Sequence, residues 1–295
     1  VCRVALSDED RVGRDLFVTW CQAAGCSVRF DAMGNIFARM AGKQNDQPPI
    51  LIGSHLDSQP TGGKFDGVYG VLAGLEVMET LNDHGIVPEL PIEIVSWTNE
   101  EGARFAPAMI GSGVHVGVFD LEYAYGRTDK SGVTLGSALA KIGYQGTGMF
   151  SEQPYTAAFE LHIEQGPILE KENKVIGVVS GIQGIRWYDL VITGKETHAG
   201  PTPMEYRADP VKDAIPLLQY IYSLADTYAP LAKITVGYLD ASPGVKNTVP
   251  GQLTISLDIR HPEAAVLEAI DTHLKNATEH FFADRPTHAR LHEIW

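Results

Sequence analysis

Histidine and carboxylate residues occur in four short clusters along the first part of the chain, and their types suit metal chemistry. The clusters contain His55 with Asp57, Asp66 between glycine-rich neighbours, the pair Glu100 and Glu101, and His162 followed by Gln165. Imidazole and carboxylate ligands together suit zinc, manganese, nickel or cobalt rather than calcium. A further carboxylate beside such ions can act on the water that the metal activates, which is the chemistry of hydrolysis.

The first cluster, His55-Leu56-Asp57, follows a short apolar run that predicts a buried strand. Side chains two positions apart on a strand point to the same face, so His55 and Asp57 can act together. We expect the Asp57 carboxylate to accept a hydrogen bond from the ring nitrogen of His55 that faces away from a metal. Taken alone, such a pair is more often a surface histidine beside a solvated aspartate.

Three further carboxylates offer two different roles. Asp66 lies just before a predicted helix, and each of its two oxygens could take one metal ion; the alternative is a helix cap in a Gly-rich turn. Glu100 and Glu101 are adjacent and point in different directions. One of them could bind metal while the other faces the activated water, and the alternative is a solvated acidic turn.

The order of the clusters favours the metal interpretation over these alternatives. A lone histidine at a strand end, such as His162, is more often structural than a ligand. However, His55, Asp66, Glu101 and His162 all fall at predicted strand ends or in the turns that follow them. Ligands of open α/β sheets gather at the carboxyl ends of the strands. The four clusters therefore predict one metal site at one edge of a sheet.

The elements that must position these clusters alternate between helix and strand. Helices are predicted at 7–25, 67–84 and 134–142, a hairpin at 28–39, and strands at 49–54, 92–98 and 157–163. This alternation predicts an α/β domain with a largely parallel sheet over residues 1–182.

The pattern changes after Gly181. Strands are predicted at 185–193, 233–239, 253–260 and 289–295, with helices at 210–228 and 262–282. Asp209 is a predicted N-cap, and Pro210 occupies the first helical position after it. The order βαββαβ predicts a ferredoxin-like domain over residues 183–295.

Composition excludes several classes of protein. The 295 residues carry a formal net charge of −14 without a stripe of lysine and arginine, which argues against nucleic acid or anionic lipid as a partner. No apolar run is long enough to cross a bilayer. Three cysteines without a CxxC motif indicate reduced thiols in a cytoplasmic protein. The chain starts at Val1 rather than Met and stops inside a predicted strand, so we expect both ends to be cut.

The motifs in this order resemble a known group of enzymes. The series HLD, GGKFDG, NEEGARF and LHIEQG is similar to the amidohydrolase branch of the dinuclear metal aminoacylase and aminopeptidase superfamily. The resemblance continues through residues 197–204 (THAGPTPM), 247–250 (NTVP) and 258–260 (DIR). Within the branch the chain most resembles the N-carbamoyl-L-amino acid hydrolases and the yeast-type β-ureidopropionases, and allantoate amidohydrolases are close relatives.

This resemblance implies a metal-dependent exopeptidase-like catalytic domain, incomplete in this chain, and a lid domain that forms homodimers. It implies two divalent ions in each subunit of the complete enzyme. His55, Asp66 and His162 would hold one ion, while Asp66, Glu101 and a histidine near the C-terminus would hold the other. No histidine of this chain stands in the matching context, so the second site lacks its final histidine here.

The resemblance also implies roles for the remaining motif residues. Glu100 matches the general base, Asp57 supports the metal site, and His198 would stabilise an oxyanion. The groups matched to substrate binding are Gln165, His198, Asn247 and Arg260. Arg260 suits a substrate carboxylate, although by itself it also fits a surface arginine at a strand end, as His198 fits a loop histidine. In a dimer, His198 and Asn247 would reach the partner's site.

Three functions remain open at this point. The first is hydrolysis of the carbamoyl C–N bond of N-carbamoyl-L-amino or β-amino acids, a non-peptide linear amide, to the free amino acid, CO2 and ammonia. The second keeps this enzyme class but takes allantoate or another ureido acid as substrate. The third is a non-catalytic metal-binding module of the same fold. The presence of Glu100 favours an enzyme, and NEEGARFAP resembles carbamoylases more than allantoate enzymes.

Overall fold

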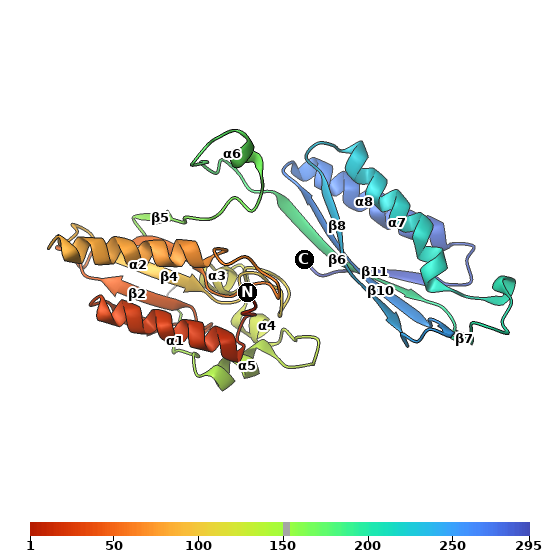
Figure 1. Ribbon diagram of the computed structural model, residues 1–295, viewed down its shortest axis with the longest axis horizontal. Helices are drawn as coiled ribbons and strands as arrows, with labels where there is room; N and C mark the ends of the chain where they lie inside the picture. Colours follow the sequence, from red (N-terminus) through yellow and green to blue (C-terminus); the bar gives the residue numbers. More distant parts are fainter. Residues whose placement is uncertain (150–153) are drawn as a thin grey trace. The chain divides into compact units, whose positions relative to one another are not determined.

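The computed structural model describes residues 1–149 and 154–295 (Figure 1). The chain divides into two compact units, Val1–Gly177 and Val178–Trp295, which we describe separately. The sequence predicts a boundary between residues 182 and 183, and the two units meet at residues 177 and 178.

The first unit is built on a five-stranded sheet with the order β1-β2-β4-β3-β5. Its strands are β1 (Ser27–Phe30), β2 (Ile36–Met40), β3 (Ile50–His55), β4 (Ile92–Trp97) and β5 (Ala157–Phe159). The strands β4, β3 and β5 are parallel, whereas the predicted hairpin β1–β2 is antiparallel and β2 runs antiparallel to β4. The sheet is therefore mixed rather than largely parallel, because the tight turn that joins β1 to β2 forces them to run in opposite directions.

Two long helices cover one face of this sheet. They are α1 (Asp8–Ala23) and α2 (Val68–Asp83), and side chains of both share one core with the inward residues of β2 and β4. The Ser7 hydroxyl caps α1 by accepting from the N–H of Asp10 at 3.1 Å. Shorter helices follow: α3 (Ile110–His115), α4 (Leu121–Tyr125), α5 (Leu135–Ile142) and α6 (Ile168–Lys171). Of these only α5 is expected from the sequence, because helices of four to six residues leave no clear periodicity.

The second unit has the predicted ferredoxin-like order. Its elements are β6 (Gly184–Thr193), α7 (Pro210–Thr227), β8 (Lys233–Ser242), β10 (Gln252–His261), α8 (Ala264–Phe282) and β11 (His288–Glu293). They form an antiparallel sheet with the order β11-β6-β10-β8. Asp209 caps α7 as expected, accepting from the N–H groups of Val211 and Lys212 at 3.0 and 3.2 Å.

A small ribbon at one end of the second sheet is not expected from the sequence. It consists of β7 (Thr197–His198) and β9 (Thr248–Val249), and a short 3-10 helix, η1 (Met204–Tyr206), follows β7 (Figure 1). Strands of two residues are too short for an alternating pattern to identify them.

The two faces of the second sheet differ in polarity. The helices α7 and α8 pack on one face, where Leu190, Ile255 and Leu257 are buried in a common core. The opposite face carries Asp258 and Arg260, because successive side chains alternate across a strand. Polar side chains therefore lie on the face opposite α7 and α8.

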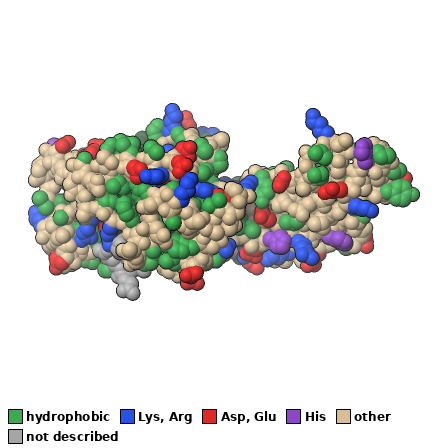
Figure 2. Space-filling model, turned by 90° about the horizontal axis from the view of Figure 1, so that it is seen from below, with side chains coloured by type: hydrophobic (Ala, Val, Ile, Leu, Met, Phe, Trp, Pro, Cys, Tyr) green, Lys and Arg blue, Asp and Glu red, His purple; other side chains and the backbone are tan. Residues whose placement is uncertain are grey.

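Charges of both signs lie on the surface of the molecule. On the face drawn in Figure 2, basic side chains are scattered among acidic ones rather than gathered into a stripe. Among the described residues, no helix combines the length and the apolar character needed to cross a membrane.

Candidate metal centre

The candidate site lies where the carboxyl ends of three neighbouring parallel strands meet. His55 is the last residue of β3, Glu100 and Glu101 follow β4, and His162 follows β5. Asp66 lies in the loop between β3 and α2. The chain thus brings the four sequence clusters to one edge of the sheet, the edge at which open α/β sheets bind ligands.

Three of these residues form a group that could hold a metal ion. The ligand atoms of His55, Asp66 and His162 all lie within 4.8 Å of one another. Asp66 Oδ1 is 3.3 Å from His162 Nε2 and 3.8 Å from His55 Nε2. The same Asp66 oxygen is buried and accepts no hydrogen bond from the described residues.

The tautomers of both histidines explain why this oxygen has no donor. His55 Nδ1 lies 2.8 Å from the main-chain carbonyl oxygen of Asp57, and His162 Nδ1 lies 2.9 Å from that of Ile163. A carbonyl can only accept, so each neutral ring carries its proton on Nδ1 and presents a lone pair at Nε2. Two imidazole lone pairs and a carboxylate oxygen therefore converge with no proton between them, an arrangement that fits a divalent cation.

Asp57 supports the site in a different way from the one expected. Its carbonyl oxygen, not its carboxylate, accepts from His55. The carboxylate instead accepts from the backbone N–H groups of Glu100 and Glu101, both at 3.2 Å. The prediction was wrong about the atom, because the backbone after β4 already occupies both oxygens of the Asp57 carboxylate. Burial raises the pKa of this carboxyl to about 6, and the neighbouring His55 opposes the rise.

Glu100 faces the same space as the three candidate ligands. Its Oε2 atom lies 3.4 Å from His55 Nε2, and its side chain keeps 30% of its exposure. Burial raises the pKa of Glu100 to about 7, while His55 acts against the rise and Asp57 adds to it. The arrangement places a proton acceptor beside the ligand group but outside it.

Glu101 and Gln165 have different partners near the ligand group. Glu101 Oε2 accepts from Gln59 Nε2 at 3.1 Å, while Glu101 Oε1 is buried without a hydrogen-bond partner among the described residues. Gln165 Nε2 donates to Asp66 Oδ2 at 2.7 Å. The two oxygens of Asp66 therefore face different neighbours, the histidines on one side and Gln165 on the other.

Backbone geometry at two positions fixes the site. Gly67 has a positive φ of 67°, and a Cβ atom there would lie 2.4 Å from the ring of His55, so only glycine fits. Asn99 is left-handed with a φ of 54°, and its side chain donates to the carbonyl of Phe105 at 2.8 Å. This turn sets the direction in which Glu100 leaves the sheet.

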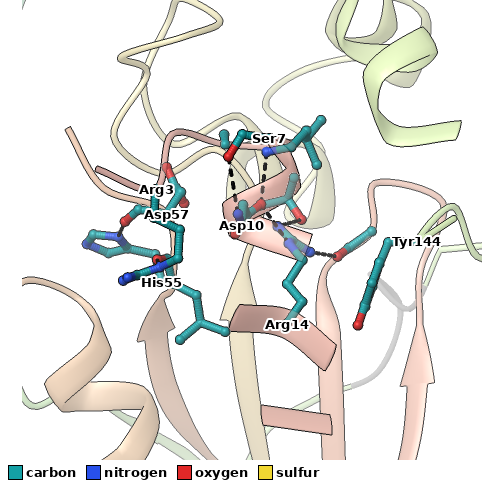
Figure 3. Close-up of polar contacts among 12 residues, drawn as sticks. Arg3, Ser7, Asp10, Arg14, His55, Asp57 and Tyr144 are labelled. Atoms are coloured by element: carbon teal, nitrogen blue, oxygen red, sulfur yellow. Dashed lines mark hydrogen bonds and ion pairs between the residues drawn. The ribbon is translucent and has the colours of Figure 1, made fainter. Parts of the chain in front are cut away.

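A buried ion pair behind the site is missed by the sequence analysis. Asp10 and Arg14 are fully buried on α1 and form an ion pair at 2.8 Å (Figure 3). Arg14 also donates to the Gly34 carbonyl at 2.8 Å and to Thr98 Oγ1 at 3.2 Å, next to the turn that carries Glu100. The i, i+4 spacing of the pair is visible in the sequence, but such pairs usually lie on helix surfaces.

Two further residues also support the site. Glu160 accepts from Ser54 Oγ at 2.6 Å, and its position two residues before His162 could have placed it on the same face. Arg3 Nε donates to the Leu56 carbonyl at 2.6 Å, next to His55. This second contact joins segments far apart in sequence, and no local pattern predicts it.

In the second unit, His198 and Asn247 are brought together. His198 on β7 pairs in register with Thr248 on β9, and the Ala199 N–H donates to the Asn247 carbonyl at 2.8 Å. The Gly200 N–H donates to His198 Nδ1 at 3.1 Å.

Arg260 is not brought to these two residues. It lies near the end of β10, eight residue steps from Gln252, which span about 27 Å at about 3.4 Å per step. The small ribbon adjoins the Gln252 end, where the Gly194 N–H donates to the Gly251 carbonyl at 2.8 Å. Within one chain, Arg260 and the pair His198 and Asn247 therefore lie at opposite ends of the sheet.

The guanidinium of Arg260 is already oriented by a carboxylate. Arg260 Nε and Nη2 donate to the two oxygens of Asp258 at 2.8 and 2.7 Å. Trp187 Nε1 donates to the same carboxylate at 2.9 Å from the neighbouring strand β6. The i, i+2 spacing on one strand places Asp258 and Arg260 on one face, which could have predicted the contact.

Comparison with known proteins gives consistent results. Residues 51–289 match the description of peptidase family M20/M25/M40. The chain is 48% identical to an N-carbamoyl-L-amino-acid amidohydrolase of Rhizobium meliloti, over 91% of this chain and 64% of the relative. It is 39% identical to one of Geobacillus stearothermophilus, over 92% and 66%. The chain thus spans slightly less than two thirds of the length of these relatives.

A relative with another activity and a solved structure complete the comparison. An allantoate amidohydrolase of Bacillus subtilis is 38% identical, over 83% of this chain and 60% of the relative. An amidase of the hydantoinase/carbamoylase family from Burkholderia vietnamiensis has a TM-score of 0.97 and 51% identity, over 100% of this chain and 71% of that chain.

Proposed function

The chain belongs to peptidase family M20/M25/M40, and on this premise we propose that the protein is a metal-dependent amidohydrolase of N-carbamoyl-L-amino or β-amino acids. With one water molecule, the reaction breaks the C–N bond between the carbamoyl group and the amino acid, which releases the free amino acid and carbamic acid. Carbamic acid then loses its remaining C–N bond and yields CO2 and ammonia. One observation carries the proposal: the lone pairs of His55 and His162 converge with a donor-free oxygen of Asp66, beside the carboxylate of Glu100.

Two observations support metal sites here: the geometry of the ligand group, and membership of a metal-dependent family. We assign one divalent ion to His55, Asp66 and His162, and we assign Asp66 and Glu101 to a second ion. Zinc, manganese, nickel and cobalt suit such ligands. A divalent metal at this position acts as a Lewis acid and favours the ionised form of water.

Glu100 is our candidate for the general base. Its Oε2 atom faces the ligand group at 3.4 Å from His55 Nε2, where it can take a proton from the attacking water. The same carboxyl can return this proton to the leaving nitrogen, so that no proton is lost from the site during one turnover. The Asp57 carboxylate keeps Glu100 in place by accepting a hydrogen bond from the backbone N–H of Glu100.

The groups proposed to recognise the substrate lie on both units. Asp258 takes two N–H groups of Arg260, which leaves the remaining donors of the guanidinium for a substrate carboxylate. The side-chain amides of Gln165 and Asn247 can bind the ureido or carboxylate group. His198 can donate from Nε2 to the oxygen on which negative charge develops.

We further propose that the protein is a homodimer that combines groups from both subunits. A substrate of a few heavy atoms cannot contact Arg260 and His198 of one chain, because about 27 Å of β10 separates the two ends of the sheet. His198 and Asn247 would therefore serve the site of the partner subunit. Among the described residues, β10 is the one strand that pairs with β8. The outer edge of β8 and the exposed apolar side chains of Val211, Ile215 and Tyr222 along α7 offer a surface for such pairing.

Allantoate is the second candidate substrate, because the Bacillus subtilis relative that matches this chain is an allantoate amidohydrolase. Allantoate also carries a ureido group and a carboxylate, so the same groups can bind it. Which of the two substrates the protein prefers depends on the residues that surround the rest of the bound substrate.

The test uses the full-length protein loaded with each of the four metals in turn. We expect amino acid and ammonia to be released from N-carbamoyl-L-amino acids, faster than allantoate is consumed. The Glu100→Gln variant should keep its metal and lose about 10²- to 10⁴-fold in kcat, the usual contribution of a general base. A metal-loaded protein that releases no amino acid from any of these substrates would overturn the proposal.

A further inference from the structure

We propose that Arg207 is a positioning residue that holds the His198 imidazole with its proton on Nε2. The proposal rests on the proposed function, in which His198 donates a hydrogen bond to the developing oxyanion. Arg207 itself need not contact the substrate.

The hydrogen bond to Nδ1 determines the tautomer of His198. The Gly200 N–H donates to His198 Nδ1 at 3.1 Å, so Nδ1 must offer a lone pair. The proton of the neutral ring is then on Nε2, and within the described residues Nε2 has no hydrogen-bond partner. The exposed ring therefore presents an N–H donor, the form that an oxyanion requires.

The loop that supplies this N–H has little support from regular structure. The strand β7 has only two residues, and its one partner among the described strands is the equally short β9. Residues 199 and 202 are partly buried, whereas residues 200, 201 and 203–206 are exposed. Without another contact, the direction of the Gly200 N–H would be poorly fixed.

Arg207 supplies that contact through the same peptide group. Its Nη2 atom donates to the Ala199 carbonyl at 2.6 Å, and this carbonyl belongs to the peptide unit whose N–H is that of Gly200. A peptide unit is planar, so fixing its oxygen also fixes its N–H. A guanidinium at the oxygen also polarises the unit and strengthens the hydrogen bond that the N–H donates to His198.

A second anchor makes the arrangement rigid. Arg207 Nη2 and Nε donate to the Thr202 carbonyl at 2.8 and 3.0 Å, so one planar guanidinium spans the turn on both sides of Gly200. Among the described residues, no carboxylate forms an ion pair with Arg207. Its charge therefore acts on two peptide carbonyls, and a lysine, which lacks the planar fork, could not reproduce the geometry.

The first experiment is a double-mutant cycle in kcat. Removing an oxyanion donor costs about 10²- to 10³-fold in kcat, so His198→Ala should lose that much and Arg207→Met at least about tenfold, with KM nearly unchanged. In the His198→Ala background, Arg207→Met should cause no further loss of kcat. An equal loss in both backgrounds would show a merely structural role and overturn the proposal.

A matched control separates positioning from stability. Arg285 in the same unit also donates to a carbonyl, that of Phe281 at 2.6 Å, and pairs with Asp213 at 2.7 Å. Arg285→Met should lower the melting temperature and leave kcat unchanged. If Arg207→Met unfolds, Arg207→Lys replaces it, because lysine keeps the charge and the fold. Arg207→Lys should lower kcat in the wild type and cause no further loss of kcat in the His198→Ala background.

The second experiment does not depend on turnover. In protein labelled with ¹⁵N in histidine, the ring of His198 should show an unprotonated Nδ1 and a protonated Nε2. Arg207→Met should move both nitrogen shifts toward those of a mixture of tautomers, and Arg285→Met should not. Unchanged shifts in folded Arg207→Met would overturn the proposal, whereas a wild-type protein without hydrolase activity would refute only the proposed function.

Discussion

The two units hold their candidate functional side chains in opposite ways. In the first unit, His55 is 2% exposed and lies at the end of a central strand, with the buried Asp57 and the Asp10–Arg14 pair behind it. In the second unit, His198 is exposed on a two-residue strand and depends on backbone contacts of its own loop. Metal ligands need a geometry that is fixed before binding, whereas a group that closes on a substrate can lie on a loop.

The largest effect should come from a ligand of the first unit. Asp66→Asn keeps the size of the side chain but removes the negative charge that the two imidazole nitrogens face. Loss of a ligand should weaken metal binding by more than the 10- to 100-fold that loss of an outer partner costs. We expect metal analysis after dialysis to show depleted Asp66→Asn and metal-retaining Asn247→Ala. Equal metal content in the two variants would contradict the assignment of the metal ligands to the first unit alone.

The buried pair behind the site should give the next largest effect. Arg14→Met leaves the Asp10 carboxylate buried without its partner, and such a change costs about 3–5 kcal/mol. The matched control is Arg11→Ala on the same helix, because the Arg11–Asp15 pair is 3.7 Å apart and 55% exposed on both sides. We expect the control to change the free energy of unfolding by less than about 1 kcal/mol in urea. If Arg14→Met lowered the free energy of unfolding by as little as the control, the buried Asp10–Arg14 pair would not be what stabilises the first unit.

A substitution on the polar face of the second sheet should change substrate binding alone. A hydrogen bond to a charged group contributes about 1.5–3 kcal/mol, so Arg260→Ala should raise KM by roughly 10- to 150-fold. Metal content should not change, because Arg260 belongs to the second unit. The check is steady-state kinetics with substrates that have or lack the carboxylate. The variant should lose the preference for the substrate that carries the carboxylate. A preserved preference would exclude Arg260 from carboxylate binding.

The smallest effect is a pH dependence that belongs to the first unit. Burial lowers the pKa of His115, and its Nδ1 atom has no partner among the described residues. The folded state therefore binds the proton less readily than the unfolded state, so this contribution to stability is present at neutral pH and is lost as pH falls below about 6.5. The free energy of unfolding should fall less between pH 7.5 and 5.5 in His115→Gln than in the wild type. The exposed His280→Gln should behave like the wild type, and identical slopes for all three proteins would contradict the prediction.

Local patterns predict much of this structure, and contacts between distant segments account for what they miss. The cap at Asp209, the β1–β2 hairpin and the ferredoxin-like order follow from turn chemistry and periodicity. The convergence of His55, Asp66 and His162 follows from strand ends that share one sheet edge. The choice of the Asp57 carbonyl over its carboxylate does not follow, because it depends on where the end of β4 lies.

The same limit applies to the supporting residues. Arg14 reaches Thr98 and Arg3 reaches Leu56 across long stretches of chain. Arg207 contacts a turn only a few residues away, but the sequence does not show that the turn bends back upon itself. Asp258 is the exception, because strand alternation alone places it beside Arg260.

The short edge strand β5 has a consequence for the kinetics of metal release. It has three residues and, within the described part of the chain, pairs with β3 alone. It precedes His162 in an exposed stretch of chain. Edge strands open locally at far lower free energy than central ones. Opening of β5 would carry one imidazole away while β3 and its His55 stay in place. We expect the metal to leave at the rate at which this edge opens, and amide hydrogen exchange at Phe159 should then keep pace with metal release and not with global unfolding.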